Sequence, residues 1–187
     1  MSHAKLHDPS HDLPHGAHPH HTLAQWVAIF TALLATLGAI VGYQGSRLMH
    51  EALLYKNESV LKKAQATDQW NYYQAVSTKE HVMELAVELL PPERAKPFAA
   101  KIAKYRTQKD QVKAKADAFE AASEHADAES ARLDRPYTSM ALAMIFLQIA
   151  ISLASITALT GRAWLFAVAG ISAAAGIILW VTGLWLV

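Results

Sequence analysis

The chain has 187 residues, a hydrophobic content of 52% and a net charge of +1 at pH 7. A nearly neutral net charge does not suggest a nucleic-acid partner, and the lack of cysteine excludes thiol catalysis, disulfides and thiolate metal sites. The apolar residues are concentrated in uncharged runs, so we expect a lipid bilayer to be their solvent.

Residues 1–21 form a tail rich in histidine and proline. Pro9, Pro14 and Pro19 argue against a continuous helix, so we expect this tail to be disordered. Crowded neutral imidazoles can chelate Zn²⁺, Ni²⁺ or Cu²⁺ loosely, and they titrate near about pH 6.5. The tail therefore predicts weak metal binding or a pH-dependent charge through His3, His7, His11, His15, His18, His20 and His21.

Three uncharged runs, residues 22–46, 137–161 and 163–187, are each longer than the ~20 residues that cross a bilayer as a helix. We therefore predict an all-α membrane protein with three transmembrane helices. The first run is too long for a cleaved signal peptide and follows a segment with a single lysine, which favours an uncleaved anchor.

Five residues within these runs are candidates for helix packing or for lining a pore. Gly38 and Gly42 form a GxxxG pair, which permits close approach of a helix of the same chain or of another copy. Gly170 and Gly176 belong to a face of small residues in the last run. Gln148 needs a hydrogen-bond partner in the membrane, so we expect it to face protein, in an interhelical bond or in a polar ring.

Between the first two runs, residues 47–135 form the one long charged segment. Pro91, Pro92 and Pro97 interrupt it in the middle, because proline lacks the backbone donor that a helix needs. The two arms are nearly equal in length and can begin and end at one membrane surface. The segment therefore predicts a long antiparallel coiled-coil hairpin with its apex at residues 91–97.

Hydrophobic periodicity supports this pairing of the arms. The second arm alternates steps of four and three residues, which is typical of a heptad seam, through Phe98, Ile102, Tyr105, Lys109, Val112, Ala116, Phe119, Ser123, Ala126, Ser130 and Leu133. The first arm shows a weaker pattern with one candidate every seventh residue, at Leu54, Leu61, Asp68, Ala75, Val82 and Leu89. The small and polar seam residues favour association with further chains.

Charge gives an independent prediction of the register. Folding at the apex pairs residues whose numbers sum to about 183. Lys56, Lys62 and Lys63 then face the acidic residues Glu120, Glu124 and Asp127. In the other half, Glu80, Glu84 and Glu88 face the basic residues Arg94, Lys96, Lys101 and Lys104. Each exposed pair contributes at most ~1 kcal/mol, so the pattern specifies register more than it stabilises.

Lysine and arginine are concentrated beside the hairpin ends of the uncharged runs. The positive-inside rule therefore places the hairpin and the C-terminus in the cytoplasm. The histidine tail and the turn at residues 160–162 lie on the opposite side of the membrane under this rule.

An aromatic and amide cluster lies midway along the first arm, within residues 67–75. Asp68 at a seam position is costly unless it is paired, and Lys115 or Lys113 lies opposite it in the predicted register. The neighbouring side chains are Gln69, Trp70, Tyr72 and Tyr73. The cluster predicts either a polar layer that fixes register or a site for a ligand or partner.

This cluster contains the run Asp-Gln-Trp-Asn-Tyr-Tyr-Gln-Ala from Asp68 to Ala75, and Glu51-Ala52-Leu53-Leu54 precedes it. Together with the layout of one helix before the hairpin and two after it, these residues resemble the bacterial membrane-protein family catalogued as domain of unknown function 4337. The resemblance covers most of the chain beyond the tail. It implies the fold and a bacterial inner membrane, and it brings no established activity, cofactor or catalytic residue.

Three functions are compatible with these features. We find no catalytic motif, so we expect no enzymatic activity. The leading hypothesis is a membrane-anchored structural protein that homo-oligomerises and presents its cytoplasmic hairpin to a protein partner. The first alternative is an oligomeric ion channel with Gln148 as a polar ring, and the second is a metal-responsive membrane protein that acts through the histidine tail.

Overall fold

The computed structural model describes residues 20–186, with side chains from Ala24 onwards, so the predicted metal site at His3–His18 lies outside the described residues. Three helices make up this part of the chain: α1 (His20–Leu89), α2 (Pro92–Thr160) and α3 (Ala163–Trp185). No strand occurs within residues 20–186, which confirms the all-α class. Each helix includes a stretch that is long and apolar enough to cross a membrane.

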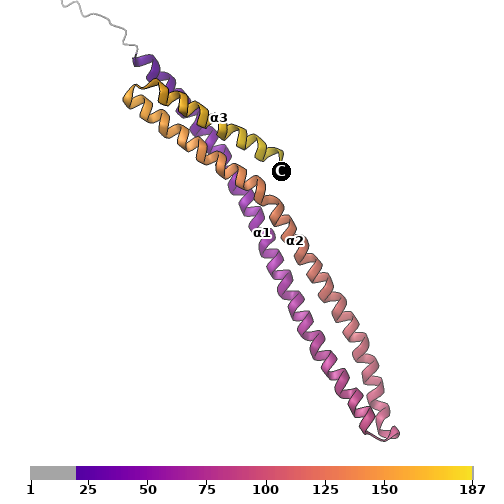
Figure 1. Cartoon of the computed structure of the whole chain (residues 1–187). Helices are drawn as coiled ribbons and strands as arrows, with labels where there is room; N and C mark the ends of the chain where they lie inside the picture. The colour runs from indigo at the N-terminus through magenta and orange to yellow at the C-terminus, as the bar shows by residue number, and fades with distance from the viewer. Residues whose placement is uncertain (1–19, 187) are drawn as a thin grey trace, which may run out of the picture.

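α1 and α2 run side by side in opposite directions along their length (Figure 1). At the end of this pair that lies away from the α1–α2 turn, α3 folds back and packs mainly on α2. Each of the two long helices includes one predicted membrane span and one predicted arm of the hairpin without a break. α1 contains no proline, and its glycines lie where α2 packs closely, so nothing in its sequence ends the helix before Leu89.

The turn between α1 and α2 consists of Leu90 and Pro91 alone. Pro91 caps α2, and its carbonyl oxygen accepts hydrogen bonds from the backbone amides of Arg94 and Ala95 at 2.9 and 3.1 Å. Pro92 occupies the first helical position, where a missing N–H costs nothing. The turn is therefore shorter than the predicted apex at residues 91–97, because Pro97 is accommodated inside α2.

Pro136 also lies inside α2 instead of opening a separate helix. It is fully buried, and its ring removes one backbone donor from the helix. α1 and α2 change direction together close to the C-terminal end of α3 (Figure 1). A proline at this place fits a bend that separates the three-helix part from the two-helix part.

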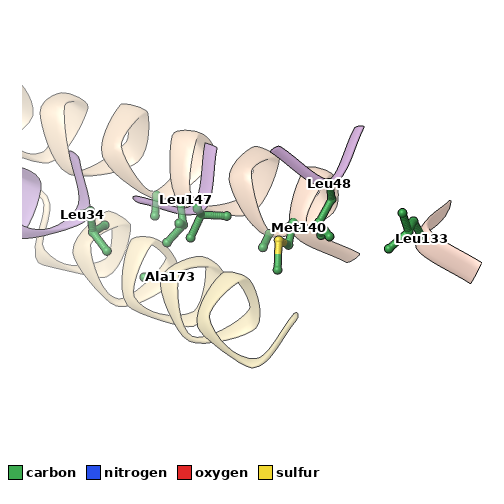
Figure 2. Close-up of a cluster of buried hydrophobic side chains, with 9 residues drawn as sticks. Leu34, Leu48, Leu133, Met140, Leu147 and Ala173 are labelled. Atoms are coloured by element: carbon green, nitrogen blue, oxygen red, sulfur yellow. The ribbon is translucent and has the colours of Figure 1, made fainter. Parts of the chain in front are cut away.

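A heptad core holds the three helices together, as Figure 2 shows. α1 contributes Leu34, Val41 and Leu48, and α2 contributes Met140 and Leu147, each spaced by seven residues along its helix. Ala173 completes this cluster from α3. The side chains at this spacing face one another over the whole three-helix part, so the apolar runs pack as a bundle.

α3 is held against the long helices by close packing and by two hydrogen bonds. The hydroxyl of Ser172 donates to the carbonyl oxygen of Phe146 at 2.8 Å, and the indole N–H of Trp180 donates to Gln44 Oε1 at 2.7 Å. The turn before α3 depends on Gly161, which has φ of 66°, a region that favours glycine. This turn directs α3 back along the bundle.

The predicted seam of the second arm is the side of α2 that faces α1. All its members are buried or half-buried, and Val112, Ala116, Ser123, Ala126 and Leu133 are among the most buried residues of α2. Every residue of the predicted seam therefore lies on the covered side of this arm.

The predicted seam of the first arm is wrong, because every one of its members is exposed: Leu54, Leu61, Asp68, Ala75, Val82 and Leu89. The side of α1 that faces α2 instead contains the buried residues Ser59, Ala66, Val76 and Glu80. Three of these four residues are small or polar, so hydrophobicity marks only Val76. Beyond Leu48, every leucine of α1 is exposed.

Candidate functional site on the outer hairpin

The outer hairpin, which we define as residues 47–135, contains most of the chain's charged side chains. Lys56 pairs with Asp127, and Lys63 pairs with Glu120 at 2.5 Å. In both pairs the residue numbers sum to 183, as the charge pattern predicts for this half. Between them the hydroxyl of Ser123 donates to the carbonyl oxygen of Ser59 at 2.9 Å, so the register is fixed at a buried polar contact.

A second set of ion pairs lies nearer the apex and centres on Glu80. Arg106 Nε donates to Glu80 Oε1 at 2.9 Å, and Lys109 Nζ donates to Glu80 Oε2 at 2.5 Å. Arg106 also donates from Nη2 to Glu84 Oε1 at 2.8 Å, and His81 Nδ1 lies 3.1 Å from Glu84 Oε2. Only 4% of the Glu80 side chain is exposed, so this carboxylate lies between the helices.

The predicted partners of these glutamates, which were Arg94, Lys96, Lys101 and Lys104, do not pair with them; Arg106 and Lys109 do. Side chains on a helix lean toward its N-terminus. In an antiparallel pair, the side chain of Glu80 therefore points away from the apex and that of Lys109 points toward it. The two side chains meet although their Cα atoms are not level with each other. The periodicity identified Lys109 as a seam residue. The direction of helical side chains, added to this position, would have indicated its ion pair with Glu80.

The electrostatics of this cluster favour the charged forms. Hydrogen bonds from Lys109 and then Arg106 hold the pKa of Glu80 below its usual value of 4.5. The hydrogen bond with Glu80 raises the pKa of Lys109, and hydrogen bonds with Glu80 and Glu84 raise the pKa of Arg106. The carboxylate therefore remains ionised between two cations.

The aromatic and amide cluster lies beside these ion pairs. Trp70 and Tyr73 are half-buried and meet edge to face with ring centroids 5.6 Å apart, and the ammonium of Lys109 lies 5.9 Å from the centroid of Tyr73. The amide of Gln108 donates to the hydroxyl of Tyr72, and Gln69 is half-buried. These residues form a continuous layer between α1 and α2 with the Glu80 cluster.

Asp68 and Lys115 are not members of this layer. Both side chains are exposed, and no ion pair joins them within the described residues. Their predicted pairing is wrong because it assumed that Asp68 faces α2. Asp68 instead lies on the outer surface of α1, on the same line of the helix as Leu54 and Leu61.

Two hollows lie side by side on one flank of the outer hairpin, close to the three-helix part. The first has a volume of about 430 Å³ and is lined by Met49, Leu53 and Lys56 of α1 and by Asp127 and Ala131 of α2, among others. The second has a volume of about 550 Å³ and is lined by residues that include Val60, Lys63, Ser123, Glu124 and Ala131. Ala131 and Asp127 line both hollows, so the two form one groove.

The candidate residues of the apolar runs differ in their surroundings. Gly38 and Gly42 lie against Met144 of α2, and Gly176 lies against Ala143 and Leu147, so these glycines serve packing within the chain. Gly170 has open space around it. Gln148 is exposed on the surface of α2, although the sequence predicts that it faces protein.

The described residues include no group of three or more histidine, cysteine or acidic side chains that could hold a metal ion. His20 and His21 lie in α1, but their side chains are outside the described set. The metal-binding prediction for the tail therefore stays a prediction.

The fold and these surfaces define a class of protein: three helices apolar enough to cross a membrane, two of which continue as a charged antiparallel pair. The profile of the family described as Domain of unknown function (DUF4337) matches residues 23–186, so the chain belongs to this family. The expected family resemblance is confirmed. No curated protein and no solved structure matches the chain.

Proposed function

We propose that the protein is a membrane-anchored scaffold of the bacterial inner membrane. Its three apolar helices hold it in the bilayer, and the outer hairpin extends into the cytoplasm as an antiparallel coiled coil. Several copies associate, and the assembled hairpins present the exposed surface beside the aromatic cluster, at Tyr72, to a cytoplasmic protein. The excess of lysine and arginine at the hairpin ends of the apolar stretches supports this orientation.

The observation that carries this proposal is the inverted distribution of side chains on the outer arm of α1. Its inner side is small or polar, as at Ser59 and Ala66, whereas Leu54, Leu61 and Val82, on one line of the helix, are 57%, 56% and 53% exposed. Apolar side chains grouped on one face of a helix indicate a covering partner. Leu61 follows Arg47, the first charge after the span, by about 20 Å of helix rise, beyond the reach of the bilayer core.

The mass of the protein in nanodiscs tests self-association. We expect native mass spectrometry to give a multiple of the chain's mass at protein concentrations where one chain occupies each disc on average. A single chain per disc over the whole range of protein to scaffold ratios contradicts the proposal. Unanchored residues 47–135 are not a substitute for the full chain, because the three-helix part fixes the height of every copy.

A second candidate function, an oligomeric channel, rests on Gln148. Its amide is exposed on a helix that is apolar enough to cross a membrane, where an unpaired amide is unfavourable. In a ring of chains, the amide of Gln148 can bond with a polar group of the adjacent chain or line a water-filled pore. Ion flux into liposomes distinguishes a channel from a scaffold, since a scaffold of the same mass carries none.

A further inference from the structure

The outer surface of α1 carries a ridge of three exposed side chains, Leu54, Leu61 and Asp68, spaced by seven residues. Helical periodicity places this ridge on the flank of the hairpin opposite the groove, because the groove is lined from α1 by Met49, Leu53 and Val60. One hairpin therefore has a ridge on one side and a groove on the other.

The ridge and the groove match in height. The ion pairs between α1 and α2 place Leu54 level with Glu129, which lies between the first hollow's Asp127 and Ala131. By the same register Leu61 is level with Ala122, next to Ser123 of the second hollow. Copies that cross one membrane in the same orientation stand at the same height, so each ridge leucine faces a hollow of its neighbour.

Charge continues the match toward the apex. The third ridge residue, Asp68, is level with Lys115. On the groove flank at this height the exposed residue is Lys113, which precedes Asp127 by two heptads and therefore lies on the same line of α2. The carboxylate of one copy and the ammonium of the next have opposite charges. The alternative two-fold contact of α1 with α1 places Asp68 against Asp68, which is repulsive.

The apolar runs extend the same arrangement. Gln148 follows Asp127 by three heptads, so it lies on the groove flank of α2. At about its height α1 carries the exposed Thr36, whose hydroxyl donates to the carbonyl oxygen of Ala32, and the ridge line itself continues through Ile40 and Leu33. An adjacent copy that contacts the groove flank therefore covers this amide as well.

We propose that Leu54 and Leu61 of each chain insert into the two hollows between α1 and α2 of an adjacent copy, with Asp68 pairing with that copy's Lys113. This inference rests on the self-association proposed above and names its surface. The two contacting surfaces differ, so the contact repeats from chain to chain, and it closes into a ring if the rotation between neighbouring copies divides a full turn.

Cysteine cross-linking tests the contact cleanly, because the chain has no cysteine of its own. The variant L54C/A131C places one thiol on the ridge and one in the first hollow, on opposite flanks of the same hairpin, so a disulfide between them joins two chains. Oxidation of membranes that contain this variant is expected to give a ladder of linked chains on a denaturing gel. The matched control L54C/A118C carries its second thiol at an exposed alanine that lines neither hollow and is expected to remain a single chain.

Two results overturn the inference. Linked dimers from L54C alone show that α1 packs against α1. An L54C/A131C ladder no stronger than that of the control shows that the ridge does not bind in the groove. If the nanodisc mass is still a multiple of the chain's mass, self-association stands and only its surface is wrong. If the mass is that of one chain, the proposed function fails as well.

A charge exchange tests the polar end of the same contact. The single variants D68K and K113D each place like charges together and are expected to reduce the fraction of oligomer in native mass spectra severalfold. The double variant D68K/K113D restores opposite charges and is expected to recover most of the oligomer. Both positions are exposed in the single chain, so unfolding of the monomer is expected to change by less than about 0.5 kcal/mol. No recovery in the double variant contradicts the pairing.

Discussion

Replacing Gly176 with leucine is expected to detach α3 from α2, whereas the same replacement at Gly170 leaves the bundle intact. A Cβ atom at Gly176 meets the carbonyl oxygen of Ala143 and Cγ of Leu147, both at 3.1 Å. The carbonyl belongs to the α2 backbone and cannot move aside without shifting the helix. At Gly170 a Cβ atom meets nothing within 4 Å.

The cost of this overpacking is about 1–3 kcal/mol for the first added carbons and more for a full leucine side chain. Thermal unfolding in mild detergent, followed by circular dichroism, is expected to show a clear loss of Tm for G176L and almost none for G170L. The pair is matched because both glycines lie in α3 and both gain the same side chain. Equal losses of Tm in the two variants show that the effect comes from α3 itself and not from its contact with α2.

Sequence periodicity identifies the second arm of the hairpin because apolar residues occupy its seam. Phe98, Ile102 and Leu133 belong to its alternating steps of four and three residues, and no other line of α2 in this arm carries apolar side chains of this size. The same rule fails for the first arm, since its inner side presents Ser59, Ala66 and Glu80. The seven-residue repeat through Leu54 and Leu61 was assigned to the contact with α2. Under the proposal above, the same repeat forms the contact with another copy.

Prolines show a second limit of local rules. Pro97 and Pro136 predict helix ends, and both lie within α2. A proline removes one hydrogen bond, and in a helix this long the packing against α1 along both arms outweighs that loss. The sequence indicates where the chain bends, but the choice between a bend and a break depends on contacts far away in the sequence.

The sequence predicts which residues belong to the candidate site better than it predicts which of them contact one another. The aromatic residues Trp70 and Tyr73 are half-buried, and Tyr73 contacts Lys109 of α2, but Asp68, two residues before Trp70, is exposed. Asp68 and Trp70 lie on different sides of α1, so one is exposed and the other is half-buried. The groove had no signal in one chain's sequence, because small residues such as Ala131 leave space only where another helix runs beside them.

The ion-pair layer predicts an acid-sensitive hairpin, with Glu80 as the central residue. Replacing Glu80 with glutamine keeps its shape but leaves Lys109 and Arg106 without the carboxylate that they share. A cation that is only 21% exposed, as Lys109 is, loses its compensating charge. We expect E80Q to lower Tm by several degrees at neutral pH, whereas E88Q, at an exposed glutamate of the same arm, leaves Tm unchanged.

The pH dependence of this loss identifies its cause. The pKa of Glu80 is lower in the folded chain than its usual value of 4.5, so its ionised form contributes stability above that value. This contribution disappears as the pH falls through the lowered pKa of the folded state. The pKa values of Glu84 and Glu120 are lowered as well, so the wild-type hairpin loses stability over the same acidic range.

The difference in Tm between wild type and E80Q is therefore expected to be largest above about pH 5 and to shrink steadily on acidification, because protonated Glu80 resembles glutamine. Thermal unfolding at a series of pH values measures this difference directly. A difference that stays constant from neutral to acidic pH shows that Glu80 acts through its packing alone. A difference that shrinks shows that its charge, shared between Arg106 and Lys109, joins α1 to α2 in the apical half of the hairpin.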